Sequence, residues 1–68
     1  MGDIRNEAVG ILEVILTLLR LQERRVREVI SSPSTFPDIR AKALEEHAEL
    51  VSMIRRRTAE LKRLVNEP

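Results

Sequence analysis

The residue best suited to acid–base or metal chemistry is His47, the single histidine in this chain of 68 residues. On a helix its neighbours three and four positions away share its face. Those neighbours are apolar and offer no metal ligand: Ala43, Leu44, Leu50 and Val51. A metal would need His47 from several chains at a symmetry axis. The pattern favours a buried polar layer with Gln22, with a rim position for His47 as the alternative, and predicts no metal and no cofactor.

An acidic string surrounds the histidine. Glu45, Glu46 and Glu49 form E-E-x-x-E, which resembles half of the metal-binding signature of the all-α nucleoside-triphosphate pyrophosphatases. That resemblance implies a second E-x-x-D element on another helix, and the chain contains none. We therefore expect a solvated acidic face. The chain also lacks a Ser–His–acid arrangement and a Gly-rich phosphate loop, so no catalytic residues and no enzymatic activity are predicted.

Arginines are the main cationic residues, but their arrangement does not predict a nucleic-acid site. Twelve basic residues against eleven acidic ones give a net charge of +1, too small for a strong overall field. Consecutive residues such as those of 55–57 point about 100° apart on a helix, and no aromatic residue lies among them for base stacking. We therefore do not expect nucleic-acid binding.

Antiparallel pairing of two helices would bring these charges together. It is expected to place Arg20 and Arg24 near Glu45 and Glu49, and Arg55 or Arg56 near Glu13. The sequence thus predicts interhelical ion pairs, which set the register more than they add stability.

Two amphipathic helices account for the pattern of the whole chain. Apolar residues recur at spacings of three and four on both sides of one break that contains Pro33 and Pro37. We predict a helix over about 4–31, a turn over about 32–35 and a helix over about 36–66. Such a short connection makes the helices antiparallel. The predicted fold is an all-α helical hairpin forming a single domain.

Local signals at the helix ends support these bounds. Asp3 is expected to cap the first helix, and Thr35 with Asp38 has the spacing of a capping box for the second. Phe36, the single aromatic residue, is expected to close the turn end of the hairpin against Val29 or Ile30.

The first helix carries more apolar surface than one partner helix can cover. Its apolar arc between residues 8 and 21 spans about 250° at about 3.6 residues per turn, whereas an ordinary surface helix buries a stripe slightly wider than about 100°. The excess predicts self-association. The expected oligomer interface consists of Val9, Ile11, Leu12, Ile15, Leu16, Leu18 and Leu19.

The simplest such assembly is a homodimer that forms a four-helix bundle, with a trimer or a higher oligomer as the alternative. A different partner could also cover the excess face, as in an adaptor that binds another protein helix. The apolar stretch is too short and too interrupted for a membrane span, and no leader pattern precedes it. We expect a cytoplasmic protein with no membrane partner.

In length, hairpin layout and charged heptads the chain resembles the Rop-like family, whose hairpins dimerise into a four-helix bundle. That resemblance implies a homodimer and nucleic-acid binding, but the family's aromatic residues on the first helix have no counterpart here. The chain is equally similar to computationally designed hairpin oligomers. Two segments carry this resemblance: residues 59–65 and the helix start at Thr35-x-Pro37-Asp38. Both resemblances imply a structural, homo-oligomeric role.

Overall fold

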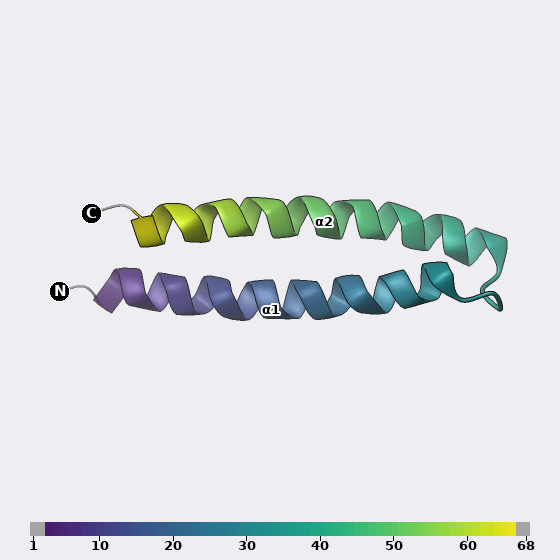
Figure 1. Cartoon of the computed structure of the whole chain (residues 1–68), viewed down its shortest axis with the longest axis horizontal. Helices are drawn as coiled ribbons and strands as arrows, with labels where there is room; N and C mark the ends of the chain where they lie inside the picture. Colours follow the sequence, from purple (N-terminus) through teal and green to yellow (C-terminus); the bar gives the residue numbers. More distant parts are fainter. Residues whose placement is uncertain (1–2, 67–68) are drawn as a thin grey trace.

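The computed structural model describes residues 3–66 and consists of two long helices. Helix α1 (Asp3–Ser31) and helix α2 (Pro37–Asn66) run antiparallel and are joined at one end by residues 32–36 (Figure 1). The predicted all-α hairpin is confirmed, and the helix bounds lie within one residue of those expected. The predicted cap at Asp3 involves a side chain that lies outside the described part of the structure.

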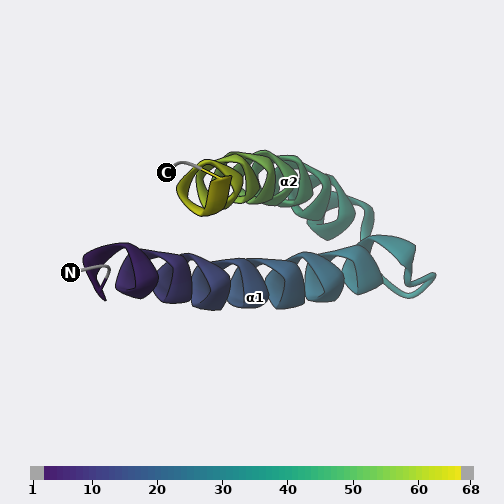
Figure 2. The same cartoon turned by 60° about the vertical axis from the view of Figure 1, so that its left-hand side comes forward.

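The hairpin is a rod. Its principal extents are 53 × 14 × 12 Å, and its radius of gyration is 15.6 Å, compared with about 11 Å for a compact globular chain of this length. In Figure 2, α1 runs across the view while α2 points forward, so the two helices are inclined to each other. A rod of two helices has little interior, and most side chains remain in contact with solvent.

The contact between the helices follows a heptad pattern along both. The α1 residues that turn toward α2 are spaced alternately by three and four: Val9, Leu12, Leu16, Leu19, Glu23, Val26 and Ile30. This spacing keeps one stripe of a helix facing its partner over many turns. Among the described residues, only Leu12 and Leu16 are buried, with 7% and 2% of their surface exposed. The hydrophobic core of the single chain therefore lies in the middle of α1 and is very small.

Arg40 ties the turn to the end of α1. From the first turn of α2 its Nη2 atom donates to the carbonyl oxygens of Ser32, at 2.9 Å, and Thr35, at 3.3 Å. A cation suits this position because carbonyl groups at the end of a helix lack partners within the helix. Its Nε atom is buried without a hydrogen-bond partner among the described residues. Sequence reasoning did not identify this residue.

The turn differs from the prediction in two side chains. The Thr35 hydroxyl donates to the Val29 carbonyl oxygen at 2.8 Å, so it closes the end of α1 and does not take part in the expected capping box with Asp38. Phe36 is 69% exposed and does not close the turn, so that prediction was wrong. Arg40 reaches into the turn instead, and Phe36 supplies only its carbonyl, which accepts from the Arg40 N–H at 2.9 Å.

Candidate functional site

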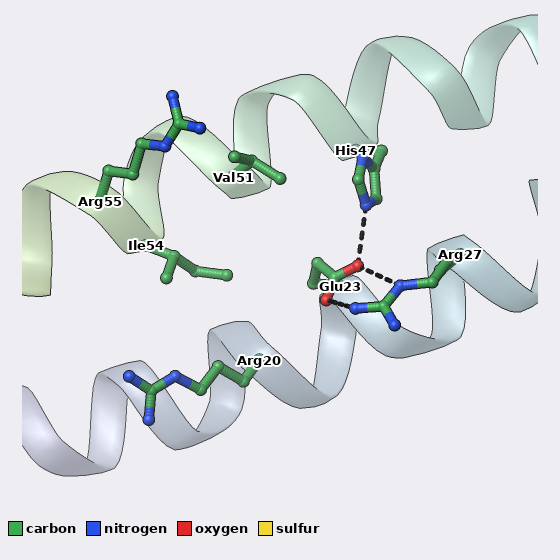
Figure 3. A pocket seen from close by; sticks show the side chains of 7 residues that line it. All are labelled: Arg20, Glu23, Arg27, His47, Val51, Ile54 and Arg55. Carbon is green, nitrogen blue, oxygen red and sulfur yellow. Dashed lines mark hydrogen bonds and ion pairs between the residues drawn. The ribbon is translucent and has the colours of Figure 1, made fainter.

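Three charged or ionisable side chains meet between the helices (Figure 3). Glu23 occupies a position of the α1 heptad stripe where an apolar residue is typical, and only 12% of its side chain is exposed. Its Oε2 atom lies 2.8 Å from His47 Nε2 on α2 and accepts a hydrogen bond from Arg27 Nε at 2.8 Å. The second carboxylate oxygen pairs with Arg27 Nη2. The contact with His47 joins α1 to α2.

These contacts fix the ionisation of the glutamate. The Arg27 guanidinium, followed by the His47 imidazole, holds the pKa of the Glu23 carboxyl below its ordinary value of 4.5, and partial desolvation opposes this only in part. The same pairing raises the pKa of Arg27. Because Glu23 is ionised at neutral pH, the His47 Nε2 atom carries the hydrogen of the shared bond. The cluster therefore orients the imidazole and stabilises the pairing of the two helices.

The cluster lines one wall of an open groove of about 380 Å³. Val51 and Ile54 supply its apolar part, and Arg20 and Arg55 lie along it (Figure 3). The lining contains a histidine oriented by a carboxylate but no serine, threonine or cysteine that this histidine could activate. The cluster is a polar contact within the interface between α1 and α2.

The partner of this histidine is not the predicted residue. His47 is half-buried, with 30% of its side chain exposed, and it contacts Glu23. Gln22 is exposed and faces away from α2. The sequence predicted Gln22 as the partner of His47, whereas the structure places Glu23, the next residue along α1, against the imidazole. The five-residue turn over 32–36 sets this register, because each added turn residue shifts the antiparallel pairing of the helices.

Glu23→Gln tests how far the carboxylate stabilises the hairpin. A glutamate with a lowered pKa contributes stability that is present above its ordinary pKa and is lost as the pH falls through its folded value. Near neutral pH we expect Glu23→Gln to unfold at a lower urea concentration than the parent chain. The difference should disappear at pH values well below 4.5, where the parent chain is also neutral at this position.

Glu49→Gln is the matched control for that comparison. Glu49 is exposed on α2 and takes no part in the cluster. It undergoes the same chemical change, so its urea midpoint should follow the parent chain at every pH. If the urea midpoints of Glu23→Gln and the parent chain differ by the same amount at every pH, the ionised Glu23 carboxylate is not what stabilises the hairpin.

The seven predicted interface residues separate into two groups. Four of them face α2 within the same chain: Val9, Leu12, Leu16 and Leu19. Ile11 and Leu18 are exposed, by 61% and 60%, and point away from α2. Ile15 is half-buried at the boundary between the groups. The first group forms the small core of the hairpin, and the second is available to a partner.

Exposed apolar residues run along most of α1 on this second side. We call them the α1 outer face: Ile4, Ile11, Val14, Leu18, Leu21 and Val29, which are between 38% and 84% exposed. A strip from residue 4 to residue 29 is about 38 Å long and about 10 Å wide on a helix, so its footprint is on the order of 400 Å². The largest apolar patch on a typical monomer covers about 300–600 Å² and is often a functional surface.

The predicted ion pairs between the helices do not form in the described part of the chain. Arg20 and Arg24 do not pair with Glu45 or Glu49, and neither Arg55 nor Arg56 pairs with Glu13. Apart from the His47 contact, the observed pairs lie within one helix at spacings of three or four: Glu23–Arg27, Lys42–Glu45 and Arg57–Glu60. Glu45 and Glu49 each lie two residues from His47, so they point about 200° away from it around α2, and both are exposed.

Two further observations concern residues 3–66. No group of three potential metal ligands comes together within this range, and neither helix carries an apolar run long enough to cross a membrane. No family model, curated protein or solved structure matches the chain. The α1 outer face and the Glu23–His47–Arg27 cluster are thus the two features from which a function can be argued.

Proposed function

We propose that this chain is a structural self-association module whose hairpins assemble through the α1 outer face. The observation that carries the proposal is the contrast between the two sides of α1. In the single chain two leucines of α1 are buried, whereas six large apolar side chains on the same helix remain exposed. Burying a Val, Leu or Ile side chain completely contributes about 1.5–3 kcal/mol, so the outer face carries stabilisation that the single chain leaves unused.

The size of the hairpin supports the same proposal. A domain of fewer than about 70–80 residues with a single small core rarely gains more than about 3–5 kcal/mol of stability. A second copy brings an identical apolar face, and symmetric association buries both faces at once. The small net charge of +1 opposes such association only weakly. The product would be a bundle of four or more helices with a continuous core.

Sedimentation equilibrium over a range of protein concentrations, with helicity followed by circular dichroism, tests the proposal. We expect the parent chain to form a helical oligomer that dissociates on dilution. Leu18→Glu places a charge in the centre of the α1 outer face and should weaken association at least about a hundredfold, because every copy then buries an unpaired charge.

Thr17→Glu is the matched control. It adds the same charge to the neighbouring residue, which lies on the polar side of α1 and is exposed, and it should associate like the parent chain. A parent chain that is monomeric, compact and helical at all concentrations would overturn the proposal. A parent chain that becomes ordered only when a different helical partner is added would also overturn it.

A further inference from the structure

The α1 outer face has a charge pattern that distinguishes its two ends. Its rows follow a second heptad spacing along α1, with residues 4, 11, 18 and 25 in one row and residues 7, 14 and 21 in the next. Most of these residues are apolar, but the row ends carry opposite charges. Glu7 lies at the N-terminal end and Arg25 at the C-terminal end, and both are exposed. Neither makes an ion pair with another described residue.

We infer that a second copy of this chain docks on the α1 outer face in the antiparallel direction, with Glu7 of each copy paired to Arg25 of the other. The inference rests on the proposed function. In this register Ile11 lies opposite Leu21 of the partner subunit, and Val14 lies opposite Leu18 of the partner subunit. The two-fold symmetry of the dimer repeats both contacts. The interface then has four apolar contacts in a row, with one Glu7–Arg25 ion pair at each end.

Two hollows on the same face fit this register. One has a volume of about 410 Å³ and is lined by Glu7, Gly10, Ile11, Val14 and Ile15. The other has a volume of about 450 Å³ and is centred on residues 18–22, with Arg25 at its edge. The first can receive the partner subunit's Leu21 and the second the partner subunit's Ile11, as knobs enter holes in coiled coils.

Gly10 contributes to the first hollow. A Cβ atom at this position would meet no other atom within 4 Å in the hairpin, so the packing of α1 on α2 does not require a glycine there. Glycine within a helix costs about 1 kcal/mol relative to alanine. The open space beside Ile11 is available to a side chain of a docked copy.

If the two copies docked in parallel, like charges would face each other at both ends of the α1 outer face. Glu7 would then lie opposite Glu7 of the partner subunit, and Arg25 opposite Arg25 of the partner subunit. A parallel trimer with α1 at its centre would bring three such like charges together at each end. Like charges at facing positions of a coiled coil disfavour the pairing, so the charge pattern selects the antiparallel dimer.

Charge reversal tests the orientation. At low ionic strength Glu7→Lys and Arg25→Glu should each weaken dimerisation about tenfold, because each replaces two exposed ion pairs of the dimer with two repulsive contacts. Combining both changes in one chain restores opposite charges and should return the dissociation constant to within about threefold of the parent value. Glu13→Lys, an equal charge change at an exposed residue on the polar side of α1, is the control and should have little effect.

Disulfide trapping gives an independent readout, since the chain contains no cysteine. Glu7→Cys and Arg25→Cys chains are mixed and oxidised, and the products are identified by mass. Antiparallel docking should yield mainly the mixed disulfide, whereas parallel docking would link each variant to itself and overturn the inference. Sedimentation of the parent chain distinguishes a failure of the proposed function from a failure of the inferred orientation. A monomeric parent refutes the proposed function, and a dimeric parent whose single charge reversals leave the affinity unchanged refutes only the antiparallel orientation.

Discussion

Leu16→Glu is expected to abolish the helical fold at any protein concentration. Leu16 is 2% exposed and lies at the centre of the contact between α1 and α2. A carboxylate there loses its hydration without gaining a partner, which costs several kcal/mol in proteins. Because a hairpin of this size has only about 3–5 kcal/mol of stability, the loss exceeds what the fold can tolerate. Far-UV circular dichroism of the purified variant should show a largely unfolded chain.

Leu16→Ala gives a graded version of the same experiment. Removing a buried leucine side chain costs about 2–5 kcal/mol, so this variant should unfold at a much lower urea concentration than the parent chain. Thr17→Glu, with its side chain on the polar side of α1, controls for the added charge. A Leu16→Glu chain with parental helicity would show that the core lies elsewhere.

Arg40→Ala is expected to destabilise the hairpin by about 1–2 kcal/mol. The guanidinium donates two hydrogen bonds to the carbonyls of the turn residues Ser32 and Thr35, and hydrogen bonds from charged groups contribute about 1.5–3 kcal/mol each. The buried and unpaired Nε atom offsets part of this gain. Urea unfolding followed by circular dichroism measures the difference.

Arg40→Met separates the hydrogen bonds from the packing of the side-chain stem, because methionine keeps an apolar chain of similar length. We expect it to lose most of the stability that Arg40→Ala loses. Arg56→Ala, an exposed arginine far from the turn, should leave the urea midpoint unchanged. If Arg40→Met is as stable as the parent chain, the carbonyl contacts do not stabilise the turn.

The helices could be predicted from the sequence because their signals are local. Apolar spacing and the two prolines fixed the extent of α1 and α2 within one residue. The contacts of the turn could not be predicted in the same way. Thr35 and Arg40 each bind carbonyl groups that come near only after the chain has reversed, and such contacts depend on the exact path of residues 32–36.

The candidate site, like the fold, could be predicted from the sequence only in part. Its histidine was recognisable because a single polar ring falls on an otherwise apolar face. Its partner was missed because Glu23 looks like an ordinary charged residue unless the heptad stripe of α1 is extended beyond Leu19. That extension was the available signal, since Glu23 lies four residues after Leu19 and three before Val26. The excess apolar arc of α1 was also visible in the sequence, but only the packing of α2 shows which of its residues stay exposed.

The hairpin has a further consequence for how the assembly could be used. The first residue of α1 and the last residue of α2 lie at the same end of a rod 53 Å long, away from the turn (Figure 1). In the inferred antiparallel dimer the two copies would point their chain ends in opposite directions. Cargo joined to either helix end would sit at the two poles, held apart by roughly the span of the bundle, and a parallel dimer would instead gather all of its cargo at one pole.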